Sequence, residues 1–292
     1  MPSTIADPEA GSIDDLVSDR HRLDQPARLE TAAREAHATL RSHGAVTLPG
    51  FLTDDAVAAI AAELERAARH VPIREHAAGV YHRSALEADL APDDPRCVRQ
   101  HWYAGHVTRD MIPAYSAAHR LYVSPQFKRF IAGCVGRERV FEYADPMAGL
   151  VATILPPGGR YPWHYDTNEF VVTIVIREPD EGGVFEYCKD LRRPGDENLD
   201  GLARVLDGSD RTSVRTSRGA AGDLQIFMGR YSLHRITEVR GSAPRHVLVL
   251  SYSDRPGVIG PLDRTRSVYG RVTEAHLVAA EQQSTGPDGL VL

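Results

Sequence analysis

One stretch limits the folds open to this chain more than any other: a proline–glycine turn that leads into a histidine, an aspartate and a β-branched run. The turn spans residues 156–159, His164 and Asp166 come after it, and the run covers residues 171–176. Such a run is typical of a buried strand. Side chains at i and i+2 share one face of a strand, so the pattern predicts an imidazole beside a carboxylate.

This pair would supply two of the three protein ligands of a metal site. Two histidines and one carboxylate on one face of iron(II) form a facial triad that leaves coordination positions open. No other histidine in the chain is followed two residues later by an acid. Because an isolated His-x-Asp can also be a surface pair, the interpretation depends on the residues further along the chain.

His234 is the candidate for the third ligand, since it follows a strand-like segment and Gly229. Arg245 comes later, directly before the apolar run 246–252. A guanidinium near a metal can hold a carboxylate in a bidentate pair. Arg240 is the competing candidate for this role, and a surface ion pair is its other interpretation.

Composition narrows the class of protein. The chain has 292 residues, 42% of them hydrophobic, and a net charge of -6, so a sizeable core is expected and a basic nucleic-acid surface is not. No apolar run reaches membrane-spanning length, and residues 1–20 do not resemble a signal peptide. The three cysteines lack metal-type spacing, which favours reduced thiols in the cytoplasm. We therefore expect neither nucleic acid nor membrane as a partner.

Helices dominate the first part of the chain and short strands the second. Helical spacing or caps predict helices at residues 29–40, 53–69, 109–121, 126–135, near 199–206 and at 272–280. Strands are expected at residues 45–48, 98–103, 140–143, 148–155, 171–176, 184–187, 224–228 and 247–252.

This order predicts a mainly β protein with an all-β double-sheet core and an N-terminal helical layer. An irregular segment, residues 1–25, should precede one domain at 26–292, with its core at about 98–255. Residues 71–97 look like a long loop or lid. The polar segment 189–221 looks like a second lid or a solvated excursion.

Four motifs together resemble the iron(II)/2-oxoglutarate-dependent oxygenases. They are His164-Tyr-Asp166, the segment 222–227, the segment 234–241 that begins with His234, and Pro244-Arg245 before an aliphatic strand. The segment 44–52 and the Ser124-Pro125 helix start resemble the phytanoyl-CoA-hydroxylase-like branch and its relatives that act on free amino acids. The resemblance covers residues of roughly 25–255.

The resemblance implies a double-stranded β-helix, also called a jelly roll and related to the cupins, with iron(II) bound by His164, Asp166 and His234. It implies 2-oxoglutarate held by Arg245 and O2 as the second cosubstrate. Thr237 and Tyr252 are candidates for added hydrogen bonds to the cosubstrate, with ordinary packing as the alternative for each. The expected reaction is hydroxylation of a C–H bond in a small polar metabolite, a free amino acid or a derivative. One subgroup of relatives replaces the carboxylate ligand with a small residue and binds halide there. Because Asp166 is present, we expect hydroxylation without chloride dependence.

Substrate residues are harder to select from the sequence. Arg99 and His101 share a face of a predicted strand, and relatives use a basic residue from this half of the chain for a substrate carboxylate. Trp163 and Asn168 flank the ligand pair. Ordinary packing or a surface ion pair is the alternative for each. Further candidates of the same standing are Glu142, Tyr161 and Tyr269.

Three other functions remain open at this point. The same oxidation chemistry could give desaturation or cyclisation instead of hydroxylation. The chain could be a non-catalytic jelly-roll protein with a structural or sensing metal, although such a protein need not keep all four motifs. It could also be a cupin-type isomerase or dioxygenase, but such sites often use three or four histidines. The sequence does not predict the oligomeric state.

Overall fold

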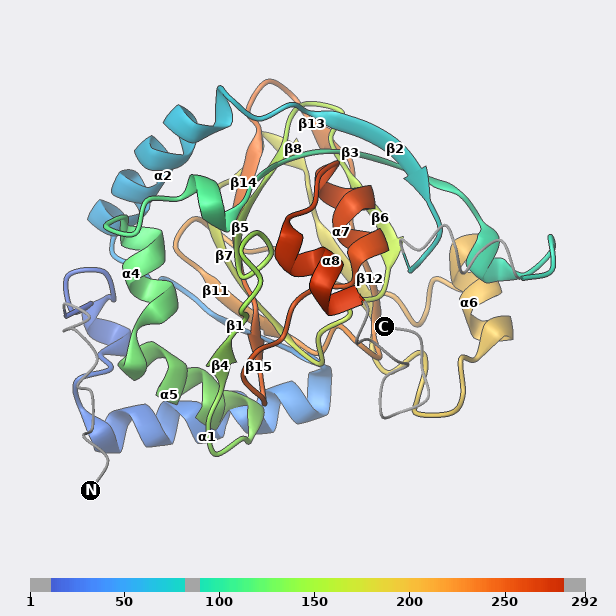
Figure 1. Ribbon diagram of the computed structural model, residues 1–292. Coiled ribbons are helices and arrows are strands. Elements are labelled where there is room, and N and C mark those ends of the chain that lie inside the picture. The colour runs from blue at the N-terminus through green and yellow to red at the C-terminus, as the bar shows by residue number, and fades with distance from the viewer. Residues whose placement is uncertain (1–11, 82–89, 281–292) are drawn as a thin grey trace.

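The computed structural model describes residues 12–81 and 90–280 and contains two main antiparallel sheets that face each other, with helices outside them (Figure 1). The larger sheet has seven strands. In spatial order they are β1 (Ala45–Leu48), β11 (Leu224–Phe227), β7 (Val171–Arg177), β14 (Arg245–Leu250), β5 (Leu150–Leu155), β3 (Gln100–Val107) and β2 (Arg74–Ala78).

The smaller sheet has four strands, in the order β10 (Arg215–Ser217), β9 (Phe185–Cys188), β12 (Leu233–Ile236) and β6 (Tyr161–His164). Two short pairs complete the described strands: β13 (Val239–Arg240) with β8 (Glu181–Gly182), and β15 (Tyr252–Ser253) with β4 (Phe141–Glu142). The expected mainly β fold with a double-sheet, jelly-roll core is confirmed.

The two faces of the large sheet differ in chemistry. In β7, Val172 and Ile174 are fully buried in the main hydrophobic core, whereas Val171 and Thr173 line a cavity between the sheets. The β11 and β14 strands alternate in the same way, because successive side chains of a strand point to opposite faces. One face thus carries the core, and the other carries the site.

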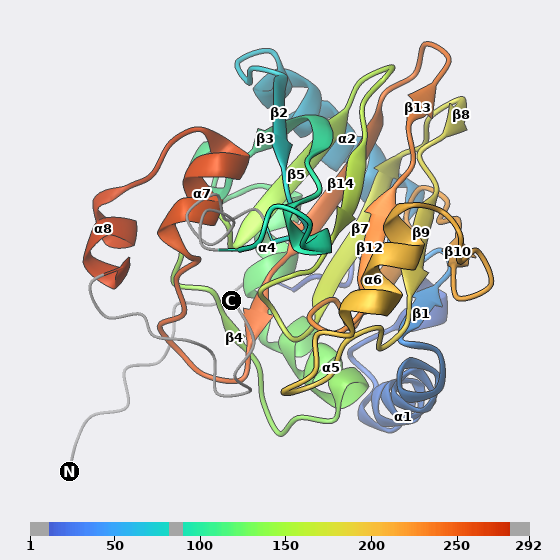
Figure 2. The same ribbon diagram turned by 90° about the vertical axis from the view of Figure 1, so that its right-hand side faces the viewer.

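Helices from the first half of the chain cover the aliphatic face of the large sheet, as the sequence predicts (Figures 1 and 2). The longer ones begin or end at predicted signals. Thr53 caps a helix by accepting the Ala56 N–H, and Gly44 ends another with a φ of 80°. The helices of this layer are α1 (Pro26–His43), α2 (Asp54–Ala68), α4 (Ala117–Val123) and α5 (Pro125–Val135).

Several local expectations are wrong. The segment expected to be a loop, 71–97, contains the edge strand β2, whose polar residues hide its pattern, and a short helical turn, η2 (Pro95–Cys97). Pro113 separates the short turn η3 (Arg109–Met111) from α4, so the single helix expected over 109–121 is two elements. Residues 1–11 and 82–89 of the expected irregular segments lie outside the described residues.

The N-terminal segment is also better packed than expected. Residues 12–25 hold only the turn η1 (Asp19–His21) as a helix, yet Ile13, Leu16 and Val17 are buried in the main core. In the insertion at 189–221, α6 (Leu199–Leu206) buries Leu202 against the smaller sheet. These segments are therefore part of the packed structure.

The end of the described chain forms two short helices instead of the single one expected at 272–280. They are α7 (Leu262–Tyr269) and α8 (Glu274–Ala280), drawn in red in Figure 1. Figure 2 shows them to the left of the sheets, whereas α6 lies over the smaller sheet. None of the described helices is both long enough and apolar enough to span a bilayer.

Candidate metal centre

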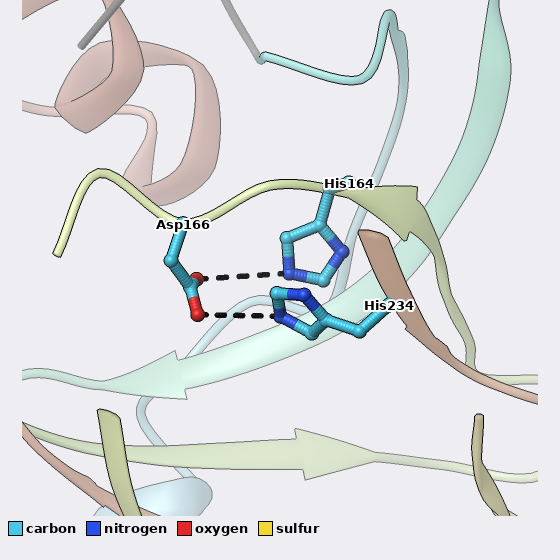
Figure 3. Close-up of side chains that lie close together, drawn as sticks. All are labelled: His164, Asp166 and His234. Carbon is cyan, nitrogen blue, oxygen red and sulfur yellow. Dashed lines mark ion pairs between the residues drawn. The ribbon is translucent and has the colours of Figure 1, made fainter. Parts of the chain in front are cut away.

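Two strands of the smaller sheet bring the three predicted ligands together. His164 on β6 pairs directly with His234 on β12, and the centroids of their rings are 4.0 Å apart. Asp166 lies just beyond the end of β6, so the predicted strand stops between the two residues of the motif. The potential ligand atoms of the three side chains nevertheless all lie within 4.8 Å of one another, and Figure 3 shows them converging.

Both imidazoles are held in the tautomer that a metal ligand needs. His164 Nδ1 lies 2.8 Å from the Pro162 carbonyl oxygen, and His234 Nδ1 lies 3.0 Å from the Ser232 carbonyl oxygen. A carbonyl only accepts, so each Nδ1 carries the proton and donates it. Each Nε2 then offers a lone pair, and these are the atoms that face Asp166, at 3.9 Å for His164 and 3.3 Å for His234.

The Asp166 carboxylate fits a cation better than a proton. Among the described residues, no donor forms a hydrogen bond with its buried Oδ2 atom. An unsatisfied buried oxygen that faces imidazole lone pairs is costly, and a bound cation removes that cost. The residues present therefore fit a divalent metal held by two neutral nitrogens and one carboxylate.

The ionisation states agree with this arrangement. Burial would raise the pKa of Asp166, but the positive charges that His234 and His164 carry when protonated, together with that of Arg264, outweigh it and hold this pKa well below its usual range. Burial lowers the pKa of His164 well below its ordinary value. The carboxylate is thus ionised and the His164 imidazole neutral at physiological pH, as metal ligands must be.

Gly229 makes room for the carboxylate. A Cβ atom at this position would lie only 1.9 Å from Asp166 Oδ2, and the Gly229 carbonyl accepts the Asp166 backbone N–H at 3.1 Å. The glycine before His234 therefore has a steric function that the sequence pattern alone did not reveal.

The three ligands open onto a cavity of about 180 Å³ between the sheets. The smaller sheet contributes Phe185 and Ile236, and the larger sheet contributes small or polar side chains such as Thr153, Thr173 and Gln225. Helix α7 supplies the remaining wall with Arg264, Thr265, Val268 and Tyr269. The cavity is thus bounded by two sheets and one helix, together with residues such as Tyr143 and Asn168 that lie outside these elements.

The two candidate arginines occupy different environments. Arg245, at the start of β14, lines the cavity, and no described residue forms a hydrogen bond or ion pair with its guanidinium. Burial lowers the pKa of Arg245 to about 10, so it is still charged at neutral pH. Arg240 is exposed and lies 3.2 Å from Glu181. An anionic ligand is the partner that Arg245 lacks.

The structure does not bring Thr237 or Tyr252 to this cavity. The Thr237 hydroxyl accepts the backbone N–H of Val184 at 2.9 Å. The Tyr252 hydroxyl donates to the Tyr122 carbonyl at 2.7 Å, in the core between the helices and the large sheet. Both hydroxyls therefore stabilise the fold at their positions.

Three of the four expected substrate residues also lie elsewhere. Arg99 is exposed, and its guanidinium donates to the Ala77 carbonyl; His101 is exposed beside Glu75. Both point outward because Trp102 takes the inward position on β3. Trp163 is buried on the opposite face of β6 from His164, where Arg235 stacks on its ring at 4.6 Å.

The remaining candidates divide between the cavity and the outside. Asn168, Tyr161 and Tyr269 line the cavity, and Asn168 Oδ1 accepts the Tyr143 hydroxyl at 2.7 Å. Glu142 lies outside it, in ion pairs with Lys128 and Arg109.

Sequence reasoning missed two basic side chains of the cavity wall. His106 lies near the end of β3, and its Nε2 forms a hydrogen bond with the Tyr161 hydroxyl. Arg264 comes from α7, a helix that was not expected because its charged residues hide its pattern. Along a strand, His106 shares a face with the large apolar Trp102, which could have indicated that His106 points inward. No sequence pattern indicated Arg264.

A comparison with protein families gives one match that covers most of the chain. The sequence model of the family described as halogenase D matches residues 29–262. A search of the curated proteins found no match.

Solved structures share the fold at low sequence identity. AviO1 from Streptomyces viridochromogenes is 17% identical, with a TM-score of 0.53 over 80% of this chain and 98% of that one. The epimerase SnoN from nogalamycin biosynthesis, in complex with Fe³⁺, α-ketoglutarate and nogalamycin RO, is 17% identical, with a TM-score of 0.51 over 79% and 85%. A prolyl hydroxylase from Trichoplax adhaerens is 14% identical, with a TM-score of 0.50 over 80% and 94%.

Proposed function

This chain belongs to the halogenase D family of iron(II)/2-oxoglutarate oxygenases, and we propose that within this family it is a hydroxylase that acts on a small polar metabolite. His164, Asp166 and His234 would hold iron(II), and Arg245 would hold the distal carboxylate of 2-oxoglutarate. A free amino acid or a simple derivative is the proposed substrate, in agreement with a cavity of about 180 Å³ between the two sheets and α7. The buried thiols of Cys134 and Cys188, which form no disulfide, support a reducing, cytoplasmic location.

The observation that carries the proposal is the Asp166 carboxylate beside the two histidines. The resemblance predicts that a halide-binding relative has a small residue at this position. Here the carboxylate occupies it, and Gly229 is shaped around that carboxylate. The chain therefore belongs to a family named for halogenation, but its own ligand set suits hydroxylation.

The protein's own contribution is positioning and exclusion of water. The carbonyl oxygens of Pro162 and Ser232 orient the two imidazoles, and Arg245 supplies an anion-binding group inside the cavity. Phe185 and Phe227 keep part of the cavity wall apolar. Iron(II), once bound, would couple the oxidation of 2-oxoglutarate to succinate and CO2, which takes up one oxygen atom of O2, to the insertion of the other oxygen atom into a C–H bond of the substrate.

Release of succinate tests this function. The purified protein should convert 2-oxoglutarate to succinate in the presence of iron(II) and O2, and one or more of the common amino acids or their conjugates should stimulate the conversion. Mass spectrometry of that substrate should show a gain of one oxygen atom, with or without added chloride. An Asp166→Ala variant serves as the inactive control.

The same experiment separates the alternatives. A chlorinated product in the presence of chloride would refute the proposal. Loss of two hydrogens would mean desaturation or cyclisation by the same ligand set. Absence of succinate together with tight metal binding would favour a non-catalytic metal protein, which has less need for the buried Arg245.

A further inference from the structure

The charged groups that line the cavity are not balanced. Among the described lining residues the only acid is Asp166, whereas Arg245 and Arg264 are both cations. If the proposed function holds, iron(II), Asp166 and Arg245 together carry two positive charges, which the 2-oxoglutarate dianion neutralises. The positive charge of Arg264 then has no counter-charge among the groups of the cavity.

Arg264 is fixed in place without a full counter-ion. One of its terminal nitrogens donates to the Tyr165 carbonyl at 3.0 Å. The other lies 3.6 Å from Asp166 Oδ1, beyond hydrogen-bond distance, and that carboxylate is already committed to the metal site. A guanidinium has five N–H donors, so most of the donors of Arg264 are not used by the described residues.

Apart from Asp166, the polar groups that line this part of the cavity are neutral. Burial raises the pKa of the cavity-lining tyrosines Tyr143, Tyr161 and Tyr269, which therefore keep their phenolic protons. Burial lowers the pKa of His106 to about 3, so its imidazole is uncharged. This end of the cavity thus offers one cation among neutral hydrogen-bonding groups.

The helix that carries Arg264 is anchored to the rest of the fold. Asp145 is fully buried; its Oδ2 accepts the Gly260 backbone N–H at 2.9 Å and lies 3.0 Å from His276 Nε2. These contacts hold the chain on both sides of α7. A rigid arginine at a cavity wall is suited to bind one ligand group in one place.

We propose that the substrate is a carboxylic acid and that Arg264 binds its carboxylate. This inference rests on the proposed function, because the charge that remains depends on iron(II) and 2-oxoglutarate occupying the other groups. A planar guanidinium binds a carboxylate through two parallel hydrogen bonds, which a neutral carboxamide cannot reproduce. Arg264 thereby selects the acid and sets its position relative to the ligands of the metal.

Matched acids and amides test this selection. The probes are the common L-amino acids, their N-acetyl derivatives and the corresponding primary carboxamides, titrated anaerobically into protein loaded with iron(II) and 2-oxoglutarate. The wild type should bind at least one acid about tenfold or more tightly than its carboxamide. Arg264→Gln should bring the two affinities to within about twofold, and Arg264→Lys should keep part of the preference.

A second arginine on the same helix serves as a control for the loss of one positive charge outside the cavity. Arg266 is exposed, and its guanidinium has no hydrogen bond or ion pair with a described residue, so Arg266→Gln should keep the full preference for the acid. If Arg264→Gln fails to fold, Arg264→Lys still tests the idea, because loss of the fork geometry should weaken acid binding and leave carboxamide binding unchanged.

Four results would overturn the inference. The wild type could bind every acid and its carboxamide equally, or Arg264→Gln could keep an unchanged preference for the acid. Arg264→Lys could weaken carboxamide binding as much as acid binding. Finally, Arg264→Gln could lose as much affinity for iron(II) as it loses for the acid. The last result would make Arg264 a support for Asp166. Failure of the proposed iron(II) and 2-oxoglutarate site, on which this inference rests, looks different, since the wild type would then not bind iron(II) and 2-oxoglutarate at all.

Discussion

The metal centre depends on residues that never touch the metal. The carbonyl groups of Pro162 and Ser232 set the tautomers of His164 and His234. Gly229 clears the space that the Asp166 carboxylate occupies. Such supporting contacts commonly change metal affinity by about 10- to 100-fold.

Gly229→Ala tests the steric part of this support. The added methyl group would displace Asp166 Oδ2, so iron(II) affinity should fall by about tenfold or more. An anaerobic iron(II) titration measures the effect. As a control, Gly195→Ala places a methyl group where no atom lies within 4 Å, but at a φ of 74°. That variant should lose some stability and keep its iron(II) affinity.

Arg245→Gln tests the anion site, with Arg240→Gln as the matched control. Removal of the cavity cation should raise the KM for 2-oxoglutarate by about 10- to 100-fold, because a charge-assisted bidentate pair is lost. Loss of the exposed Arg240, paired with Glu181, should change that KM by less than about twofold. The reverse order of effects would move the cosubstrate site to the other arginine.

His106 links stability to pH. Its pKa is about 3 in the folded chain, against an ordinary value of 6.5. Between pH 6.5 and pH 3 the unfolded chain therefore binds a proton at this histidine that the folded chain does not bind. Stability should therefore fall as the pH drops below 6.5, by up to about 1.4 kcal/mol per pH unit from this residue. His106→Gln should show a shallower loss of melting temperature between pH 7 and pH 5. An unchanged slope would mean that His106 is protonated in the folded state.

At the scale of single elements, α7 forms one wall of the cavity and depends on a buried contact for its position. His276 Nδ1 accepts the Thr273 backbone N–H at 3.2 Å, so its Nε2 carries the proton that faces Asp145. Both side chains are completely buried. The contact is thus a hydrogen bond from a neutral histidine to a buried carboxylate.

His276→Ala should loosen this wall. The buried Asp145 carboxylate would lose one of its donors, at a cost of about 3 kcal/mol of unfolding free energy. Denaturant titration measures that loss, and hydrogen exchange should show it concentrated in residues 260–280. Uniform exchange across the large sheet instead would mean that α7 and α8 do not depend on this contact.

Elements with a clear periodic pattern were predictable from the sequence. The β-branched run became β7, and the Thr53 and Ser124 caps start α2 and α5. Edge strand β2 and helix α7 were not predictable, because each is mostly polar and buries only a few residues. Their structure comes from tertiary contacts that a local pattern does not contain.

The same limit applies to the candidate site. His164, Asp166, His234 and Arg245 could be selected because their motifs lie beside recognisable strands. Arg264 reaches the cavity from a late helix, and Arg99 and His101 turn outward on an edge-proximal strand. Which side of a strand faces a cavity is decided by the packing of the whole sheet.

At the scale of the whole molecule, the two faces of the large sheet divide stability from chemistry. The helix-covered face buries aliphatic residues such as Ile174 and Leu248, and the other face presents Thr173 and Gln225 to the cavity. Changes in the helical layer should thus act mainly on stability, and changes at the cavity mainly on binding.

The central claim is that one iron(II) ion binds where the two sheets meet, between His164, Asp166 and His234. An anaerobic titration of the wild type beside His234→Ala tests it most directly. We predict one tightly bound iron(II) per wild-type chain and a loss of at least about 100-fold in affinity for the variant, with the fold retained by circular dichroism. Equal iron(II) binding by both proteins would contradict the account.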